Sequence, residues 1–208
     1  MRKGGYCYRI VGVSAGVVVM AGMTVLETWK TGGSLLDFLP ILLAASLHEM
    51  GHLTVALACR VKVKELRLDI LGARMRLDGL MSYGTEWLIA AGGPLVNLLS
   101  AAVVLSWWRM QGGEMTDGAY QFAMASLALG FINLLPVGTL DGGRMIYCAT
   151  AHWKGSYAAA ALLRYTSSIC LSILWLCAGY ALIRTGGMLT FFIFVLCLLL
   201  RVSLGEDI

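Results

Sequence analysis

The feature that most constrains this chain is a series of six long apolar runs that take up most of its 208 residues. Hydrophobic residues make up 59% of the sequence and charged residues only 13%, whereas soluble domains are roughly 45–50% apolar and about 25% charged. A water-soluble fold of this length cannot bury so much apolar surface, but a membrane protein exposes it to lipid. The sequence therefore predicts an all-α polytopic membrane protein.

The six runs are candidate transmembrane helices, because each is close to the roughly 20 residues that cross a bilayer core. They cover approximately residues 10–26, 35–59, 88–108, 119–137, 165–183 and 188–204. The first run follows three basic residues, as a signal peptide would, but lacks a small-residue cleavage site after it. We expect an uncleaved anchor and a single membrane-embedded domain over residues 1–208.

The placement of basic residues predicts the orientation. If the N-terminus is cytosolic and six spans alternate, only Lys30, Arg109 and Arg184 of the 16 lysines and arginines lie outside. Cytosolic loops carry the excess of Lys and Arg, so we expect a multi-pass cell-membrane protein with both termini in the cytosol. The net charge of +4 suits an anionic leaflet of the bilayer, and it is too small and scattered to indicate a nucleic-acid partner.

One segment between the runs has a different period. Residues 61–80, "VKVKELRLDILGARMRLDGL", alternate apolar and charged side chains around Gly72. Alternation with period two is typical of strands. We expect a short membrane-associated β-hairpin that turns near Leu71 and Gly72. The alternative is a solvated amphipathic loop whose charges only mark the cytosolic side.

The second run contains "HEMGH", residues 48–52. On a helix, positions i and i+4 share a face with β-carbons about 5–6 Å apart, so His48 and His52 can bind one zinc ion. Glu49 lies one step round the helix, where it reaches the water on the metal as general base. A lone histidine in an apolar helix is usually a packing residue, but ionisable groups inside a membrane span are costly and mark function.

A catalytic zinc usually has three protein ligands and one open position. Asp141, in "NLLPVGTLDGGR", is the best candidate for the third ligand, because it follows the fourth run at the cytosolic depth of the two histidines. The alternatives for Asp141 are a helix cap or an ion pair with Arg144. We therefore expect one Zn²⁺ per chain, with the active site towards the cytosolic side.

The chain's two asparagines, Asn97 and Asn133, both lie in apolar runs. Backbone groups freed when a substrate helix unwinds in lipid need new hydrogen-bond partners, and asparagine amides supply donors and an acceptor. We expect both to bind substrate; the alternative is that they bind neighbouring helices. The edge of the expected hairpin could add further hydrogen bonds by strand addition. The six cysteines show no C-x-x-C spacing, so we expect neither disulfides nor a cysteine metal site.

Together, "HEMGH", "AAGGPLVN" at residues 90–97 and "NLLPVGTLDGG" at residues 133–143 resemble the site-2 protease family of intramembrane zinc metalloproteases. The layout is most similar to the branch of stage IV sporulation protein FB. The resemblance implies that His48, His52 and Asp141 bind zinc, that Glu49 is the catalytic base, and that Asn133 holds the substrate backbone.

The same resemblance implies cleavage of a membrane-tethered substrate, such as a sigma-factor precursor, under the control of membrane-protein regulators. Members of the sporulation branch commonly carry a CBS domain after the last span. Here the sequence given ends at "LGEDI", so we expect neither a CBS nor a PDZ domain, which leaves substrate and regulation open.

Three other functions fit parts of the pattern. A membrane zinc protease of the prenyl-protein type also uses H-E-x-x-H, but it usually takes a glutamate as third ligand. A non-proteolytic six-span metal transporter needs ligands on both sides of a pathway, and the outer halves of the runs lack ionisable groups. An inactive pseudoprotease is the third alternative, and the intact motif argues against it.

Overall fold

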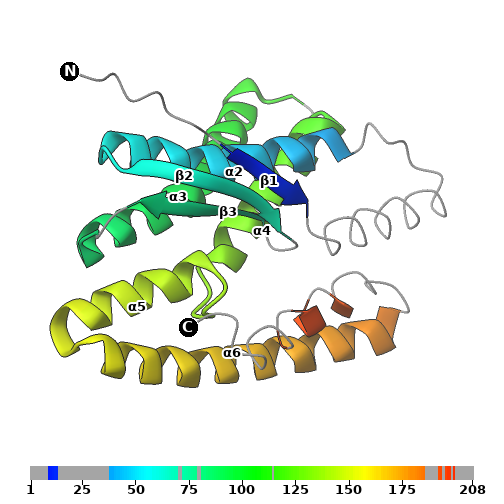
Figure 1. The fold of residues 1–208 in the computed structure, drawn as a ribbon. Helices are drawn as coiled ribbons and strands as arrows, with labels where there is room; N and C mark the ends of the chain where they lie inside the picture. The colour runs from blue at the N-terminus through cyan, green and yellow to red at the C-terminus, as the bar shows by residue number, and fades with distance from the viewer. Residues whose placement is uncertain are drawn as a thin grey trace, which may run out of the picture.

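A computed structural model describes residues 9–13, 38–69, 72–78, 81–113 and 115–185, together with 192–193, 195–197 and 199. Most of the described chain is helical, and three strands form a sheet beside the helices (Figure 1). In chain order the elements are β1 (Arg9–Val13), α2 (Leu39–Ala58), β2 (Lys62–Asp69), β3 (Gly72–Asp78), α3 (Tyr83–Gln111), α4 (Asp117–Asn133), α5 (Asp141–Lys154) and α6 (Ser156–Thr185).

Among the described residues, three helices are long and apolar enough to cross a membrane: α2, α3 and residues 156–184 of α6. Their outer faces expose large apolar side chains, for example Leu42, Val103 and Ile173. In water such surfaces would favour aggregation, whereas lipid solvates them. The expected runs at 35–59, 88–108, 119–137 and 165–183 lie largely in α2, α3, α4 and α6.

The structure corrects the start of the first expected run. Residues 9–13, which include Ile10 at the expected beginning of a span, form strand β1 instead. Ile10, Val11 and Val13 are β-branched and favour extended backbone, and a short apolar run does not distinguish strand from helix. The remainder of this run, and most of the run at 188–204, lie outside the described residues.

The three strands have the spatial order β1-β2-β3. Strand β2 pairs antiparallel with β3 from Lys62 opposite Asp78 to Asp69 opposite Gly72, and β1 pairs parallel with β2 on the other side. Strand β2 is therefore the central strand and is paired along both edges. The outer edges of the sheet belong to β1 and β3. Strands β2 and β3 follow α2 in the chain and lead into α3, whereas β1 precedes α2 (Figure 1).

Local sequence explains where several helices begin and end. The Ser82 hydroxyl accepts a hydrogen bond from the Thr85 N–H at 3.2 Å, and Thr116 caps α4 in the same way through Ala119. Both are typical N-cap residues. Helix α3 ends at Gln111, and its C-cap is Gly112, whose φ of 62° favours glycine.

Helices α2 and α3 approach each other backbone to backbone. A β-carbon at Gly51 would lie 2.5 Å from the Gly92 carbonyl oxygen, and one at Gly92 would lie 2.7 Å from the Gly51 carbonyl oxygen. Only glycine permits this approach, and small residues at such crossings are typical of membrane helices. The crossing lies beside His48 and His52, so it also fixes what α3 can place against the two imidazoles.

Candidate metal centre

Helix α2 presents His48 and His52 one turn apart on the face that packs against α3. His48 is only 5% exposed, and the two ring centroids are 4.8 Å apart in an edge-on arrangement. Their Nε2 atoms lie 3.2 Å apart. The helical spacing therefore brings two nitrogen ligands together inside the protein, as the sequence predicts.

Asp141 is the first residue of α5, and the segment before it is held against α6. Val137 and Leu140 are buried and form a core cluster with Leu171 of α6. The Ser167 hydroxyl of α6 accepts a hydrogen bond from the Gly138 N–H at 3.0 Å and donates one to the Pro136 carbonyl at 3.4 Å. Apolar packing and two hydrogen bonds thus fix the segment that positions the carboxylate.

The two glycines after Asp141 let α5 start close to this segment. A β-carbon on Gly142 would overlap the Leu134 carbonyl, and one on Gly143 would overlap the Val137 carbonyl. Any other residue would have to push α5 away from the chain that precedes it. The "DGG" motif therefore sets the depth at which the Asp141 side chain meets α2.

The three side chains converge on one point. Oδ2 of Asp141 lies 3.1 Å from Nε2 of His48 and 3.1 Å from Nε2 of His52. Ligand atoms around a tetrahedral zinc, with Zn–N bonds of about 2.0–2.1 Å, are about 3.3 Å apart. The observed triangle has nearly these edges, so His48, His52 and Asp141 are positioned to bind a metal ion.

The outer nitrogen of His52 shows which ring atom faces the metal position. Nδ1 lies 2.7 Å from the carbonyl oxygen of Ile89 and 3.3 Å from the Gly93 amide nitrogen. The shorter contact, with the Ile89 carbonyl, decides which nitrogen of His52 is protonated. A carbonyl oxygen only accepts, so Nδ1 carries the proton and donates it to Ile89. In a neutral ring Nε2 then directs a lone pair towards the Asp141 oxygen 3.1 Å away, an arrangement that a cation between them would stabilise.

Gly93 of α3 forms the floor of this site. A β-carbon there would overlap Nε2 of His52 and would lie 2.8 Å from Nε2 of His48. Both metal-facing nitrogens therefore sit directly above a position that has no side chain. The contact of Gly93 with the two imidazoles emerges only from the structure.

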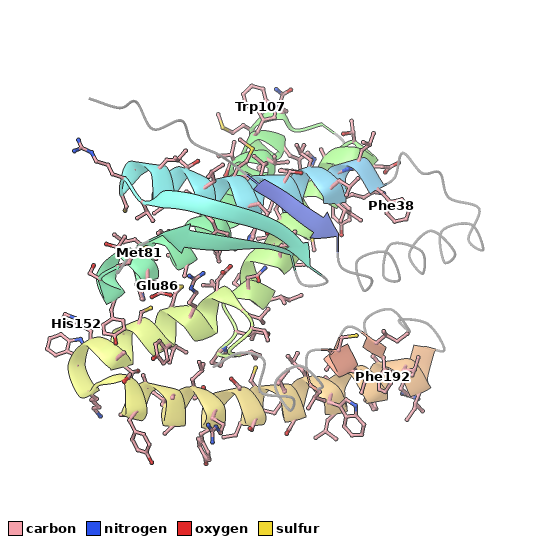
Figure 2. The ribbon with its side chains drawn as sticks, viewed as in Figure 1. Phe38, Met81, Glu86, Trp107, His152 and Phe192 are labelled. Atoms are coloured by element: carbon pink, nitrogen blue, oxygen red, sulfur yellow. The ribbon has the colours of Figure 1, made fainter. Side chains whose placement is uncertain are left out.

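Charges around Asp141 favour its role as a ligand. Burial alone raises the pKa of Asp141, but its contacts with His48 and His52 outweigh burial and hold the pKa below its usual value. Arg144, the alternative partner for Asp141, instead pairs with Glu86 of α3 at 3.1 Å. Glu86 lies in the first turn of α3, between α3 and α5. It is near Met81 and far from Trp107 (Figure 2).

The other expected site residues lie at different distances from the triangle. Glu49 follows His48 on α2 and is half-buried. Asn97 is fully buried on α3, and its amide nitrogen lies 3.3 Å from Nδ1 of His48. The Asn133 amide donates within its own helix to the Leu129 carbonyl at 3.0 Å. The support of His52 by Ile89 was missed, because a backbone carbonyl leaves no signal in the sequence.

Comparisons with known proteins agree with this geometry. Residues 109–177, which include Asp141, match the model of peptidase family M50. A zinc metalloprotease of Methanocaldococcus jannaschii is 28% identical over 132 residues, which cover 62% of this chain and 38% of the relative. Stage IV sporulation protein FB of Bacillus subtilis is 25% identical over 148 residues, covering 70% of this chain and 50% of the relative.

The chain thus spans half or less of the length of these two curated relatives. In three dimensions it is similar to the site-2 protease from Methanocaldococcus jannaschii, with a TM-score of 0.68 at 20% identity over 96% of this chain and 90% of the other. This similarity shows the fold. Residues 109–177 thus match peptidase family M50, and the chain has the fold of the site-2 protease from Methanocaldococcus jannaschii.

Proposed function

We propose that this chain is an intramembrane zinc metalloprotease that hydrolyses a peptide bond of a membrane-tethered protein, within or near its membrane segment. The observation that carries the proposal is the triangle of His48, His52 and Asp141, with edges of 3.1–3.2 Å, set among apolar helices. Two imidazoles and one carboxylate leave one tetrahedral position open, which is typical of catalytic zinc sites.

The donor set favours zinc. Neutral imidazole and carboxylate are both ligands that zinc accepts at tetrahedral geometry. A zinc ion bound there supplies a Lewis acid that lowers the pKa of water to about 7 and polarises the scissile carbonyl. The protein supplies a partly buried site in which these charges are weakly screened.

Glu49 is the proposed general base. It is next to His48 on α2 and half-buried, so its carboxylate projects one step round the helix from the metal ligands. Glu49 takes the proton from the attacking water and returns it to the leaving amine. His48, His52 and Asp141 would hold the metal and would therefore not be free to take this role.

The proposed membrane arrangement follows the basic residues. Helix α2 runs towards the cytosol, α3 returns, and α5 with the sheet lies on the cytosolic side, which places the active site towards the cytosol and both termini inside. Six spans require two more than α2, α3, α4 and α6. A first span has to begin after Val13, where β1 ends, and a sixth falls in the run at 188–204.

The proposed substrate is an extended segment of a membrane-tethered protein. A sigma-factor precursor fits, as the likeness to the sporulation branch implies, and membrane-protein regulators could control access. Asn133 keeps a second N–H and a carbonyl oxygen beyond its bond to Leu129, so its amide has capacity for a substrate backbone. In the described sheet the outer edges of β1 and β3 are the places for strand addition.

The experiment that tests the proposal combines zinc content with proteolysis. Purified wild type and Glu49→Gln are analysed for bound zinc and for cleavage of a membrane-tethered precursor in liposomes. We expect about one zinc in both, and a loss of roughly 10²–10⁴-fold in cleavage rate for Glu49→Gln, the range for a general base. Glu86→Gln is the matched control, because Glu86 pairs with Arg144; it should keep both zinc and cleavage.

Other outcomes contradict the proposal in distinct ways. A wild-type protein without zinc removes the metalloprotease. Cleavage that survives Glu49→Gln removes Glu49 as the base. Zinc flux into proteoliposomes that survives Glu49→Gln, with no cleavage by wild type, supports the metal transporter instead.

A further inference from the structure

Asn97 is a fully buried polar residue whose amide is only half satisfied. Its Nδ2 lies 3.3 Å from Nδ1 of His48, while its Oδ1 is buried and lacks a hydrogen-bond partner among the described residues. A buried acceptor without a donor costs about 1–3 kcal/mol. Because this amide contacts His48, a candidate metal ligand, its cost calls for a functional explanation.

The orientation of this amide corresponds to one tautomer of His48. Nδ2 can only donate, so Nδ1 of His48 accepts, and the ring proton of a neutral His48 then lies on Nε2, facing Oδ2 of Asp141 at 3.1 Å. This tautomer cannot bind a metal through Nε2. When Nε2 binds a metal, the proton moves to Nδ1, and two donors then face each other.

We propose that Asn97 is a positioning residue for the metal site, whose amide rotates by 180° so that Oδ1 accepts the Nδ1–H of His48 when His48 holds the metal. The rotation exchanges two atoms of similar size and gives the orphaned oxygen a donor. This inference rests on the proposed function, because it assumes a metal ion on Nε2 of His48.

The pattern along α3 supports this role. Ile89, Gly93 and Asn97 are spaced four residues apart and so lie on one face of the helix. Ile89 accepts the Nδ1–H of His52 through its carbonyl, Gly93 leaves room for both Nε2 atoms, and Asn97 reaches Nδ1 of His48. With Asn97 rotated, both histidines have the same support: an oxygen acceptor from α3 that fixes the metal-binding tautomer.

The test measures zinc affinity by competition with a chromogenic chelator, which needs no activity assay. Asn97→Leu keeps the approximate side-chain volume and removes the acceptor, whereas Asn97→Asp keeps an acceptor oxygen. We expect about 10–100-fold weaker zinc binding in Asn97→Leu, the usual effect of losing such a partner, and no comparable loss in Asn97→Asp. Ser126→Ala is the control, because it removes a buried polar group without a described partner, and it should keep wild-type zinc affinity.

A second measurement covers the case in which Asn97→Leu does not fold. In wild-type protein with ¹⁵N-labelled histidine, NMR identifies which ring nitrogen of His48 carries the proton. We expect protonated Nδ1 in the zinc-loaded protein, and that proton should exchange slowly because Oδ1 of Asn97 holds it.

The outcomes separate this inference from the proposed function. If wild type binds about one zinc and folded Asn97→Leu binds it as tightly, Asn97 does not position His48, and the protease proposal is unaffected. An unprotonated Nδ1 of His48 in the zinc-loaded protein overturns the inference as well. If wild type binds no zinc at all, the proposed function fails first.

Discussion

The substitution Gly93→Ala tests the geometry of the centre most directly, because it adds one methyl group at the floor of the site. The new β-carbon would lie 2.8 Å from Nε2 of His48, against at least 3.4 Å for ordinary contact, and closer still to Nε2 of His52. One ring or both must therefore move by about 0.6 Å or more. Ligands have to stay within roughly 0.5 Å of their working geometry, so the triangle cannot keep its edges.

We expect zinc affinity to fall at least 100-fold in Gly93→Ala, which corresponds to about 2.8 kcal/mol. Helix α3 itself should not weaken, because alanine is a better helix former than glycine by about 1 kcal/mol. The assay is chelator competition for zinc, with far-UV circular dichroism to confirm that helix content is retained.

Gly84→Ala is the matched control on the same helix. A β-carbon at Gly84 would meet only the Ser82 hydroxyl, at 3.9 Å, so zinc affinity should equal that of wild type. If folded Gly93→Ala also binds zinc like wild type, the imidazoles do not rest on Gly93, and the placement of α3 against the ligands is wrong.

Two further predictions concern α5 and the segment before it. Ser167→Ala removes both hydrogen bonds to residues 136 and 138; we expect a loss of about 1–2 kcal/mol in stability and weaker zinc binding, because Asp141 is less firmly placed. Ser126→Ala, which removes a buried hydroxyl without a described partner, should leave zinc affinity unchanged. Burial raises the pKa of Cys148 to about 12, so this thiol should resist maleimide at pH 8 in the native protein and react after denaturation in SDS. The same shift means that the folded state holds its thiol proton more tightly, so the contribution of Cys148 to stability is lost as pH rises from about 9 towards 12. Labelling of native Cys148 at pH 8 would show that it is not buried between α3 and α5.

The ligand set could be predicted from the sequence because each ligand has a local signature. His48 and His52 are four residues apart in an apolar run, so any helix there puts both on one face. Asp141 could be chosen as third ligand because few carboxylates lie near the same depth. The structure confirms the meeting of the three, and it assigns Arg144 to Glu86 rather than to Asp141.

Elements whose signal was ambiguous were predicted less well. Residues 9–13 form a strand because they pair with β2, and that pairing depends on a segment more than 50 positions further along the sequence. Helix α5 was not predicted, since residues 141–154 are too polar for a span and became helical by packing on α3 and α6 (Figure 1). From the sequence, Asn133 and Asn97 carry the same prediction of substrate binding. In the structure the Asn97 amide lies 3.3 Å from His48, a candidate metal ligand, whereas the Asn133 amide donates within its own helix.

The sequence by itself predicted that lipid surrounds this protein and that two histidines and an aspartate meet at a metal site. The composition predicts lipid around the apolar runs. The meeting of two histidines one turn apart with a distant aspartate can be predicted from helical geometry and from their similar depth in the membrane. The tertiary structure alone decided what surrounds the ligands. The carbonyl of Ile89, the missing side chain of Gly93 and the amide of Asn97 reach the imidazoles because α3 crosses α2 at Gly51 and Gly92, and contacts across helices depend on that crossing rather than on any local pattern.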